Sequence, residues 1–483
     1  MKFARAALLI SAVVTMATVM PAGASMAPTW KVAQNAALPP GGTGIPQGYL
    51  PALSCPSAGD CVAVGDFSDA SSTTRGLILN ETRGVWRNPT MITPPANAAA
   101  SPGITPYAVS CGSAASCAIV GSYQDSSNNV RSFVEEKVNG RWKSATQVSL
   151  PANALGSGQN SQLRSVDCAS AGNCSAVGTY IVKAARAQRI EGLVLDEVRG
   201  KWRRAAETSL PSGANENPFV SLGQLACVSG GNCSATGSYI DANNLTHGLI
   251  LNEVAGKWSR GTAVTLPANA NAYPNVSLSS VACASVGNCT TIGTYESESA
   301  NLEGFTVSES AGRWGRAVAM KMPAGAAANP HVFFYGFSGI SCPSAGNCST
   351  GGQYRDSSGK YQGFLIDQVN GTWRPAVELT LPSGSLMAGK NGGVVAMSCV
   401  VAGQCSAGAA YLDGSSSYQA LTVSEVDGVW QTGAKVTLPS GATSVGVDGG
   451  VYGLVCPVSG QCTATGSYLS GSTNYQGFTI TTN

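Results

Sequence analysis

One repeated unit constrains the fold of this chain more than any other sequence feature. Its clearest copy runs from Cys174 to Trp202, and close relatives recur along the chain. Each copy has two cysteines separated by five residues, and most continue with a small-residue segment of the C-x-A-x-G-x-Y type, a polar loop, an apolar run and a Gly-x-Trp turn. A repeat this regular has to be interpreted first, because it decides the architecture.

Within one repeat, alternating residues and turn formers predict four antiparallel strands. The first strand ends at a cysteine, and residues 169–173 make a tight reversal into the second. The third strand spans 192–198, and the Arg199-Gly200 turn leads into a fourth that starts at Trp202. Four-stranded units of about 57 residues fit the blades of a β-propeller. A solenoid is the alternative, but these repeats are longer than most β-solenoid rungs.

The two ends of the chain indicate a closed ring. There are eight cysteine pairs and eight tryptophans, but Trp30 precedes the first pair and no tryptophan follows the last. Residues 30–39 match the fourth strand at 430–439, and the chain ends in a third strand. We therefore predict an all-β, eight-bladed propeller of four-stranded antiparallel blades, in which the N-terminal strand around Trp30 completes the last blade. A closed ring needs no capping repeats.

The cysteines predict disulfides within the blades. Their number is even and their spacing constant, whereas zinc usually requires four convergent ligands, and His247 and His331 are the only histidines. We expect no metal and no cofactor. The predicted pairs are Cys55–Cys61, Cys111–Cys117, Cys168–Cys174, Cys227–Cys233, Cys283–Cys289, Cys342–Cys348, Cys399–Cys405 and Cys456–Cys462.

The N-terminus and the composition predict an exported protein. Lys2 and Arg5 precede an apolar run and the Ala22-Gly23-Ala24 cleavage pattern, so we assign a signal peptide to 1–24 and one propeller domain to 25–483. We expect a monomer that is secreted, either extracellular or associated with the cell wall, with no membrane span after signal removal. The net charge is +2 without a basic cluster, which argues against nucleic acid or anionic membrane as a partner.

The architecture resembles secreted bacterial β-propellers of the broad sialidase-like type. Their repeats carry an S-x-D-x-G-x-x-W turn between the third and fourth strands. The corresponding turn here is E-x-x-G-x-W, as in Glu253 to Trp258, with Lys137 and Gln368 replacing the acid in two repeats. The resemblance therefore implies the fold across the mature chain, and the catalytic residues and activity of that family are not carried over.

Residues that recur in every blade are interpreted as scaffold. We expect the tryptophans and an aromatic series to pack between blades. Acids at matching places between the second and third strands, Asp125, Asp241, Asp356 and Asp413, are interpreted as solvated turn residues. The aromatic series comprises Phe67, Tyr123, Tyr180, Tyr239, Tyr295, Tyr354, Tyr411 and Tyr468.

Function is expected on the face where the repeats differ, formed by the inter-blade loops and the loops between second and third strands. Amides, hydroxyls and rings in these loops favour a binding protein for extracellular or cell-surface carbohydrate. The predicted ligand-binding residues are Asn217, Tyr273, Asn275, His331, Phe333, Tyr335, Lys390, Asn391, Asp448 and Tyr452.

The sequence is also compatible with two other functions. A glycoside hydrolase or polysaccharide lyase would use Glu216, His331 or Asp448 as acid or base. Glu216 and Asp448 follow the third and seventh blades, which places them farther apart than a glycosidase pair requires. An extracellular protein-interaction scaffold would use the stretch from His331 to Phe337.

Overall fold

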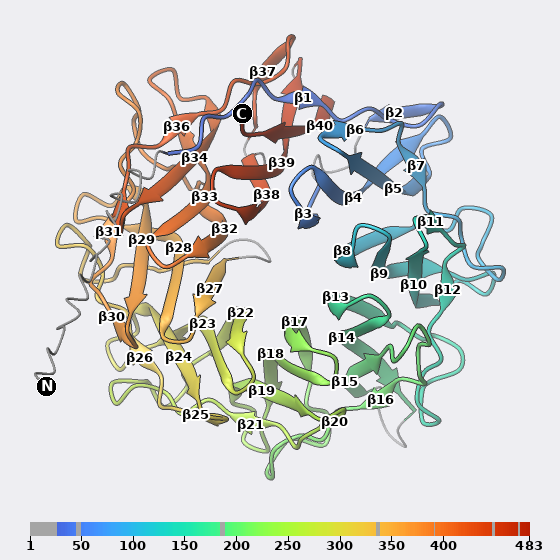
Figure 1. Ribbon diagram of the computed structural model, residues 1–483. Coiled ribbons are helices and arrows are strands. Elements are labelled where there is room, and N and C mark those ends of the chain that lie inside the picture. Colours follow the sequence, from blue (N-terminus) through green and yellow to red (C-terminus); the bar gives the residue numbers. More distant parts are fainter. Residues whose placement is uncertain are drawn as a thin grey trace, which may run out of the picture.

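The computed structural model describes residues 27–44, 50–183, 189–334, 339–390, 392–446, 450–471 and 474–483. The predicted signal peptide at 1–24 lies outside these residues. The described residues form eight antiparallel sheets arranged as blades around one axis (Figure 1). The predicted all-β, eight-bladed propeller is therefore confirmed.

The first two strands of each blade form its inner hairpin. The innermost strands are β3 (Ala52–Ser57), β8 (Thr105–Ser113), β13 (Gln162–Ser170), β17 (Ser221–Ser229), β22 (Ser277–Ser285), β27 (Ile340–Ser344), β32 (Gly393–Val401) and β38 (Gly450–Val458). The second strands are β4 (Asp60–Asp69), β9 (Ser116–Gln124), β14 (Asn173–Val182), β18 (Asn232–Ile240), β23 (Asn288–Glu296), β28 (Asn347–Arg355), β33 (Gln404–Leu412) and β39 (Gln461–Ser470).

The third strand of each blade is long and the outermost is short. The third strands are β5 (Thr74–Thr82), β10 (Val130–Val138), β15 (Arg189–Asp196), β19 (Thr246–Val254), β24 (Leu302–Ser310), β29 (Tyr361–Val369), β34 (Tyr418–Val426) and β40 (Asn474–Thr481). The outermost segments are β6 (Val85–Trp86) with β7 (Thr90–Met91), β11 (Arg141–Trp142) with β12 (Thr146–Gln147), β16 (Ala206–Glu207), β20 (Lys257–Trp258) with β21 (Thr262–Ala263), β25 (Arg313–Trp314) with β26 (Val318–Ala319), β30 (Thr372–Trp373) with β31 (Val377–Glu378), and β35 (Val429–Trp430) with β36 (Ala434–Lys435).

The N-terminal segment closes the ring as predicted. β1 (Gln34–Asn35) pairs with β40, and Trp30 forms a bridge to Thr482. Figure 1 shows this first segment running along the outer edge of the last blade. Two further short strands, β2 (Gly42–Gly44) and β37 (Ala442–Ser444), extend the sheets of the first and eighth blades.

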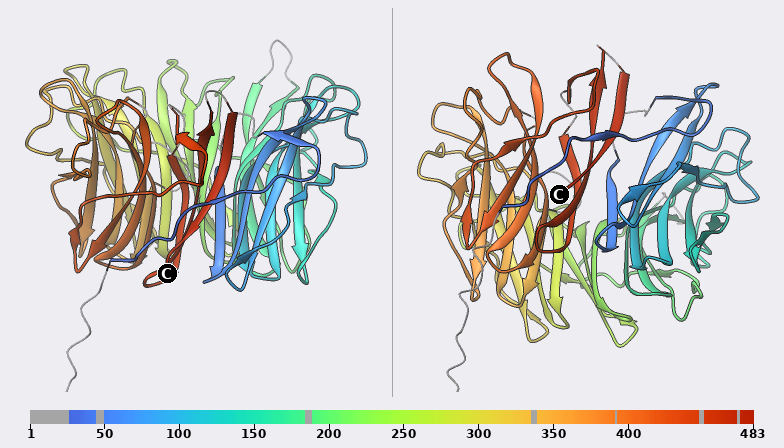
Figure 2. Two further views of the ribbon diagram at one scale, coloured as in Figure 1. Left: turned by 90° about the horizontal axis from the view of Figure 1, so that it is seen from above. Right: turned by 45° about the horizontal axis from the view of Figure 1, so that its top comes forward.

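The two faces of the ring are built from different connections. The loop face carries the loops between second and third strands together with the loops that join consecutive blades. The turn face carries the cysteine turns and the Gly-x-Trp turns. In the left view of Figure 2 the turn face lies at the bottom, on the side of the C-terminus.

Nearly identical bonds recur along the turn face. All eight predicted disulfides form, and no cysteine is free. Within a blade, the second turn donates a backbone hydrogen bond to the first, as from Gly256 N to Gly231 O at 2.9 Å. At Gly231 φ is +78° and an added Cβ would lie 2.7 Å from Gly256 N, so this turn requires glycine. The disulfide and this bond fix both turns of the blade.

The core is divided among the seams, which we define as the interfaces between consecutive blades. One cluster, for example, joins Val120 and Val134 of the second blade to Leu163, Ala176 and Leu195 of the third. The inner strands are also hydrogen-bonded across seams. Cysteine N–H groups donate to a side-chain oxygen of the preceding blade: Cys111 to Ser54 at 3.0 Å, Cys168 to Ser110 at 2.9 Å, Cys227 to Asp167 at 2.7 Å, Cys399 to Ser341 at 3.0 Å, and Cys456 to Ser398 at 3.0 Å.

The tryptophans stabilise the same seams nearer the outside, as the sequence predicts. The Nε1 group of Trp142 donates to Asn80 Oδ1 of the preceding blade at 3.1 Å, and that of Trp314 donates to Asn252 Oδ1 at 3.2 Å. Trp430 makes the corresponding bond to Asp367 at 3.0 Å. These repeated side chains therefore serve the ring.

Candidate functional site

The inter-blade loop enters four of the blades through the same backbone conformation. In each, a buried proline and a buried valine or isoleucine flank one residue with positive φ. The proline carbonyl accepts a hydrogen bond from the end of the second strand, as from Ile240 N to Pro218 O at 2.7 Å and from Glu296 N to Pro274 O at 2.7 Å. Both flanking residues are held inside, so the middle residue lies at the loop face.

The residue in this middle position differs between blades. In the second blade it is Gly103, with φ of 53°, which suits a residue without a Cβ. In the fourth, fifth and sixth blades it is Phe219, Asn275 and His331, with φ of 43°, 41° and 46°. Asparagine tolerates this region, whereas phenylalanine and histidine adopt it at a cost. Such strain clusters at functional sites, so these three neighbouring blades present the candidate site.

The other non-glycine residues with positive φ have a different explanation. They lie in the Gly-x-Trp turns, as Asn139 does, or in the loops between second and third strands, as Asn128 and Ala300 do. Those positions recur around most of the ring, because the turns themselves require the conformation. Among the described inter-blade loops, only the entries of the fourth to sixth blades combine positive φ with a residue other than glycine.

Exposed rings and an amide surround these entries. Phe219 is 52% exposed and Tyr273 is 70% exposed. The His331 ring stacks on Phe333, with centroids 4.8 Å apart, and its Nδ1 has no hydrogen-bond partner among the described residues. Asn275 Nδ2 donates to Glu296 Oε1 at 2.8 Å. We call the loops that enter the fourth to sixth blades the sector. The sector combines apolar ring faces with polar side chains.

The predicted ligand-binding residues are only partly brought together. Tyr273, Asn275, His331 and Phe333 belong to the sector just described, whereas Asn217 accepts a hydrogen bond from Ile190 N at 3.3 Å and supports its own loop. Lys390 is exposed at the entry to the seventh blade, and Tyr452 lies half-buried on β38 of the eighth. Tyr335, Asn391 and Asp448 lie outside the described residues.

The catalytic candidates do not form a described pair of acids. Glu216 is exposed on the loop that enters the fourth blade, and Asp448 lies outside the described residues. Within the described ranges, no group of three or more histidine, cysteine, aspartate or glutamate side chains is arranged to hold a metal ion. No helix of the described chain is long and apolar enough to cross a membrane.

The sequence list omitted Phe219, although a signal for it exists. Pro102-Gly103-Ile104, Pro218-Phe219-Val220, Pro274-Asn275-Val276 and Pro330-His331-Val332 align as one Pro-x-aliphatic triplet. The glycine in the first triplet indicates the backbone conformation of the others. Comparison of the triplets would have singled out all three middle residues.

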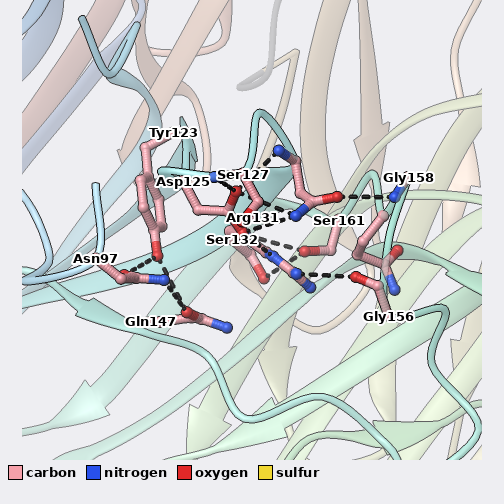
Figure 3. A network of polar contacts seen from close by, with 12 residues as sticks. Asn97, Tyr123, Asp125, Ser127, Arg131, Ser132, Gln147, Gly156, Gly158 and Ser161 are labelled. Carbon is pink, nitrogen blue, oxygen red and sulfur yellow. Dashed lines mark hydrogen bonds and ion pairs between the residues drawn. The ribbon is translucent and has the colours of Figure 1, made fainter. Parts of the chain in front are cut away.

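The repeated tyrosines are buried, which confirms their structural interpretation. Tyr123 is 1% exposed. Its hydroxyl donates to Asn97 Oδ1 at 2.7 Å and approaches Gln147 Oε1 at 3.2 Å, which ties the inter-blade loop to the second blade (Figure 3). Burial, the largest cause, raises the pKa of Tyr123 to about 12. These tyrosines are therefore no platform for a ligand.

The acids between second and third strands organise their loops, but Asp125 is not solvated as expected. It is 5% exposed, and its Oδ1 accepts hydrogen bonds from the backbone N of Ser127 and Asn129, both at 2.9 Å (Figure 3). Arg131 Nε donates to its Oδ2 at 2.8 Å. The expectation of solvation overlooked the cation six residues later, which allows the carboxylate to be buried.

The fold and the candidate site define a class: a closed, disulfide-stapled eight-bladed propeller with one distinctive sector of loops. No protein-family model and no curated protein matches this sequence. Among solved structures, an ulvan lyase of polysaccharide lyase family 25 overlaps with a TM-score of 0.47 at 10% identity, covering 83% of this chain and 98% of that one. The Hadza microbial sialidase Hz136 gives 0.35 at 11% identity, covering 74% and 75%.

A protein of unknown function from Dyadobacter fermentans is also similar. It gives a TM-score of 0.34 at 9% identity and covers 90% of this chain and 95% of that one. Similarity at this level does not identify an activity or a ligand.

Proposed function

We propose that this chain is an exported binding propeller whose loop face recognises an extracellular or cell-surface carbohydrate. The observation that carries the proposal is the set of strained side chains, Phe219, Asn275 and His331, on three consecutive blades. Glycine occupies the equivalent position at Gly103, so the fold does not require a side chain there. The strain is explained if these side chains contact a ligand.

The chemistry of the sector favours a sugar. Phe219, Tyr273 and Phe333 offer exposed ring faces, and the exposed Asn275 offers an amide beside them. Ligand sites typically combine apolar and aromatic surface with a few placed polar groups, and a sugar ring presents both C–H faces and hydroxyls. Eight disulfides without a free cysteine fit the oxidising surroundings outside the cell.

The test compares the wild-type protein with a Phe219→Gly, Asn275→Gly, His331→Gly variant on a glycan array and by titration of the strongest hit. We expect the variant to fold, because glycine suits this conformation, and to lose at least about tenfold in affinity, equivalent to roughly 1.4 kcal/mol. Ala300→Gly is the matched control: it relieves positive φ on the same face, at 56°, but removes one methyl group. Its affinity should equal that of the wild type.

Two results would redirect the proposal. Turnover of a bound glycan that is lost in a Glu216→Gln variant would indicate a hydrolase or lyase. Absence of any glycan binding, with retained capture of a protein through the same three side chains, would indicate an interaction scaffold. Unchanged glycan affinity in the triple variant would remove the sector from the binding site.

A further inference from the structure

The seams contain a second repeated contact, which lies near the turn face. In it, a side chain near the end of the third strand of one blade faces a side chain of the next blade. The second side chain lies one position further along the repeat than the first. Three seams show the pairing as a hydrogen bond: Lys137 Nζ donates to Asn80 Oδ1 at 3.4 Å, Asn252 Nδ2 donates to Glu309 Oε1 at 2.7 Å, and Gln368 Nε2 donates to Ser308 Oγ at 3.3 Å. In each pair, one partner supplies an N–H donor.

Three other seams place two acids at these same positions. The pairs are Glu136 with Glu197, Asp196 with Glu253, and Asp367 with Glu425, and the two acids of each pair interact electrostatically. Glu197, Glu253 and Glu425 are 6%, 3% and 5% exposed. Two carboxylates contain no donor, and both Glu425 Oε2 and Asp367 Oδ1 lack a hydrogen-bond partner among the described residues. These acid pairs therefore lack the hydrogen bond that the other seams make, unless one carboxyl group carries a proton and donates it.

The groups facing each pair supply one cation for two acids. Each of these three seams has a basic residue directly after the tryptophan of its earlier blade. These residues are Lys143, Arg203 and Arg374. Each lies close enough to lower the pKa of the pair's second acid. The same position is Ser259 in the seam with the Asn252–Glu309 contact, Gly315 in the seam with Ser308–Gln368, and Arg87 in the seam with Asn80–Lys137.

The remaining polar neighbours are few. Ser175 Oγ donates to Glu253 Oε2 at 3.3 Å, and Trp258 Nε1 and Trp430 Nε1 donate to Asp196 and Asp367. The exposed Asp427 lines the cavity of about 210 Å³ beside Glu425. One positive charge therefore faces two or three acids, which leaves room for one proton.

We propose that the second acid of each acid–acid seam, Glu197, Glu253 or Glu425, retains a proton beside the first acid, and that these protons stabilise the ring near neutral pH. The proton supplies the donor that a lysine or amide supplies elsewhere in the ring. Its loss leaves two like charges in a buried contact, which destabilises the seam.

The direction of the pH effect follows from burial. Burial, the largest cause in each case, raises the pKa of Glu253 and of Glu425 to about 7, and neighbouring Asp196 and Asp367 add to it. Burial and then Glu136 raise the pKa of Glu197 to about 7. A folded-state pKa above the unfolded value of about 4.3 means that the stabilisation is complete below pH ~4, and is lost as the pH rises through 7.

The decisive experiment measures unfolding between pH 5 and 9 for the wild type and for a Glu197→Gln, Glu253→Gln, Glu425→Gln variant. Glutamine already occupies this position as Gln368, so the substitution suits the fold. We expect the wild type to lose stability between pH 5 and 8 and the variant to lose clearly less. The number of protons released on unfolding near pH 6 should fall by about one for each substitution. An unchanged pH profile would overturn the proposal.

A second variant separates proton retention from packing. Arg374→Gln removes the cation that favours ionisation of Glu425, so the seam should hold its proton to a higher pH. We expect the pH at which stability is lost to move upward. A uniform loss of stability at every pH, without such a shift, would show that Arg374 only packs in the seam and would count against a retained proton on Glu425.

Discussion

The turn face and the loop face of this ring differ in what the blades share. On the turn face, disulfides and the bond between the two turns recur from blade to blade, for example from Gly200 N to Gly172 O at 2.9 Å and from Gly371 N to Gly346 O at 2.7 Å. On the loop face, the same backbone position carries Gly103 in one blade and Phe219 or His331 in others. Residues that recur in every blade build the ring, whereas residues that differ between blades are available for contact with a ligand.

The faces also differ in how they hold carboxyl groups. On the loop face, Asp125 accepts hydrogen bonds from two backbone N–H groups and Arg131, and its pKa falls to about 2 although burial opposes the change. In the seams near the turn face, burial raises the pKa of Glu253 to about 7. Acidification should therefore weaken the loops, whereas alkalinisation should weaken the seams.

The strongest challenge to the turn face is reduction of its disulfides. Each closes a loop so short that chain entropy gives about 2 kcal/mol, and eight bonds together should dominate the response even if they do not add fully. We expect the midpoint of thermal unfolding to fall markedly in a strong reductant. A midpoint that stays constant while mass spectrometry shows open thiols would refute the staple role.

A smaller effect is expected where one seam departs from the pattern. Glu135 is 1% exposed, its Oε2 has no partner among the described residues, and burial raises its pKa to about 8. Leu195 and Leu251 occupy the equivalent position in other blades. Glu135→Leu should raise the free energy of unfolding by about 2 kcal/mol, measured by denaturant titration. Loss of ligand binding in this variant would show that departures within a seam can also be functional.

Phe219 and Gly103 occupy the same loop position in different blades, so each residue can be replaced by the other. Phe219→Gly should stabilise the fold by about 1 kcal/mol, because a bulky residue leaves the left-handed region. Gly103→Phe should destabilise it by a similar amount for the opposite reason. Denaturant unfolding of both variants checks the pair. If Phe219→Gly is the less stable protein, packing of the phenylalanine outweighs backbone strain and the functional argument weakens.

The last prediction concerns the response of the loop face to acid. The depressed pKa of Asp125 means that its contribution to stability is present above pH ~4 and is lost as the pH falls through 2. Asp125→Asn should therefore destabilise the protein at pH 7 and approach the wild type at pH 2. Thermal unfolding across this range tests it. Equal destabilisation at both pH values would assign the effect to geometry and not to charge.

The repeat made the scaffold predictable, because blade count, closure through Trp30 and the pairing of the cysteines all follow from counting and phase. The seam acids were not predictable in the same way. The pairing of Asp367 with Glu425 depends on how one blade sits against the next, which strand periodicity within a blade does not reveal. Phe219 was missed because the prediction favoured polar residues of its loop, such as Asn217. Its positive φ cannot be recognised from one copy of the repeat and requires comparison with the other copies.

Ring closure has a consequence for how this chain can be rearranged. Asn483 N donates to Thr29 O at 2.9 Å, so the end of the last strand lies beside the start of the described chain. A short linker could join the two, and new ends could be opened in a loop between any two blades. Such permuted proteins would keep every seam, while any blade could become the first to leave the ribosome.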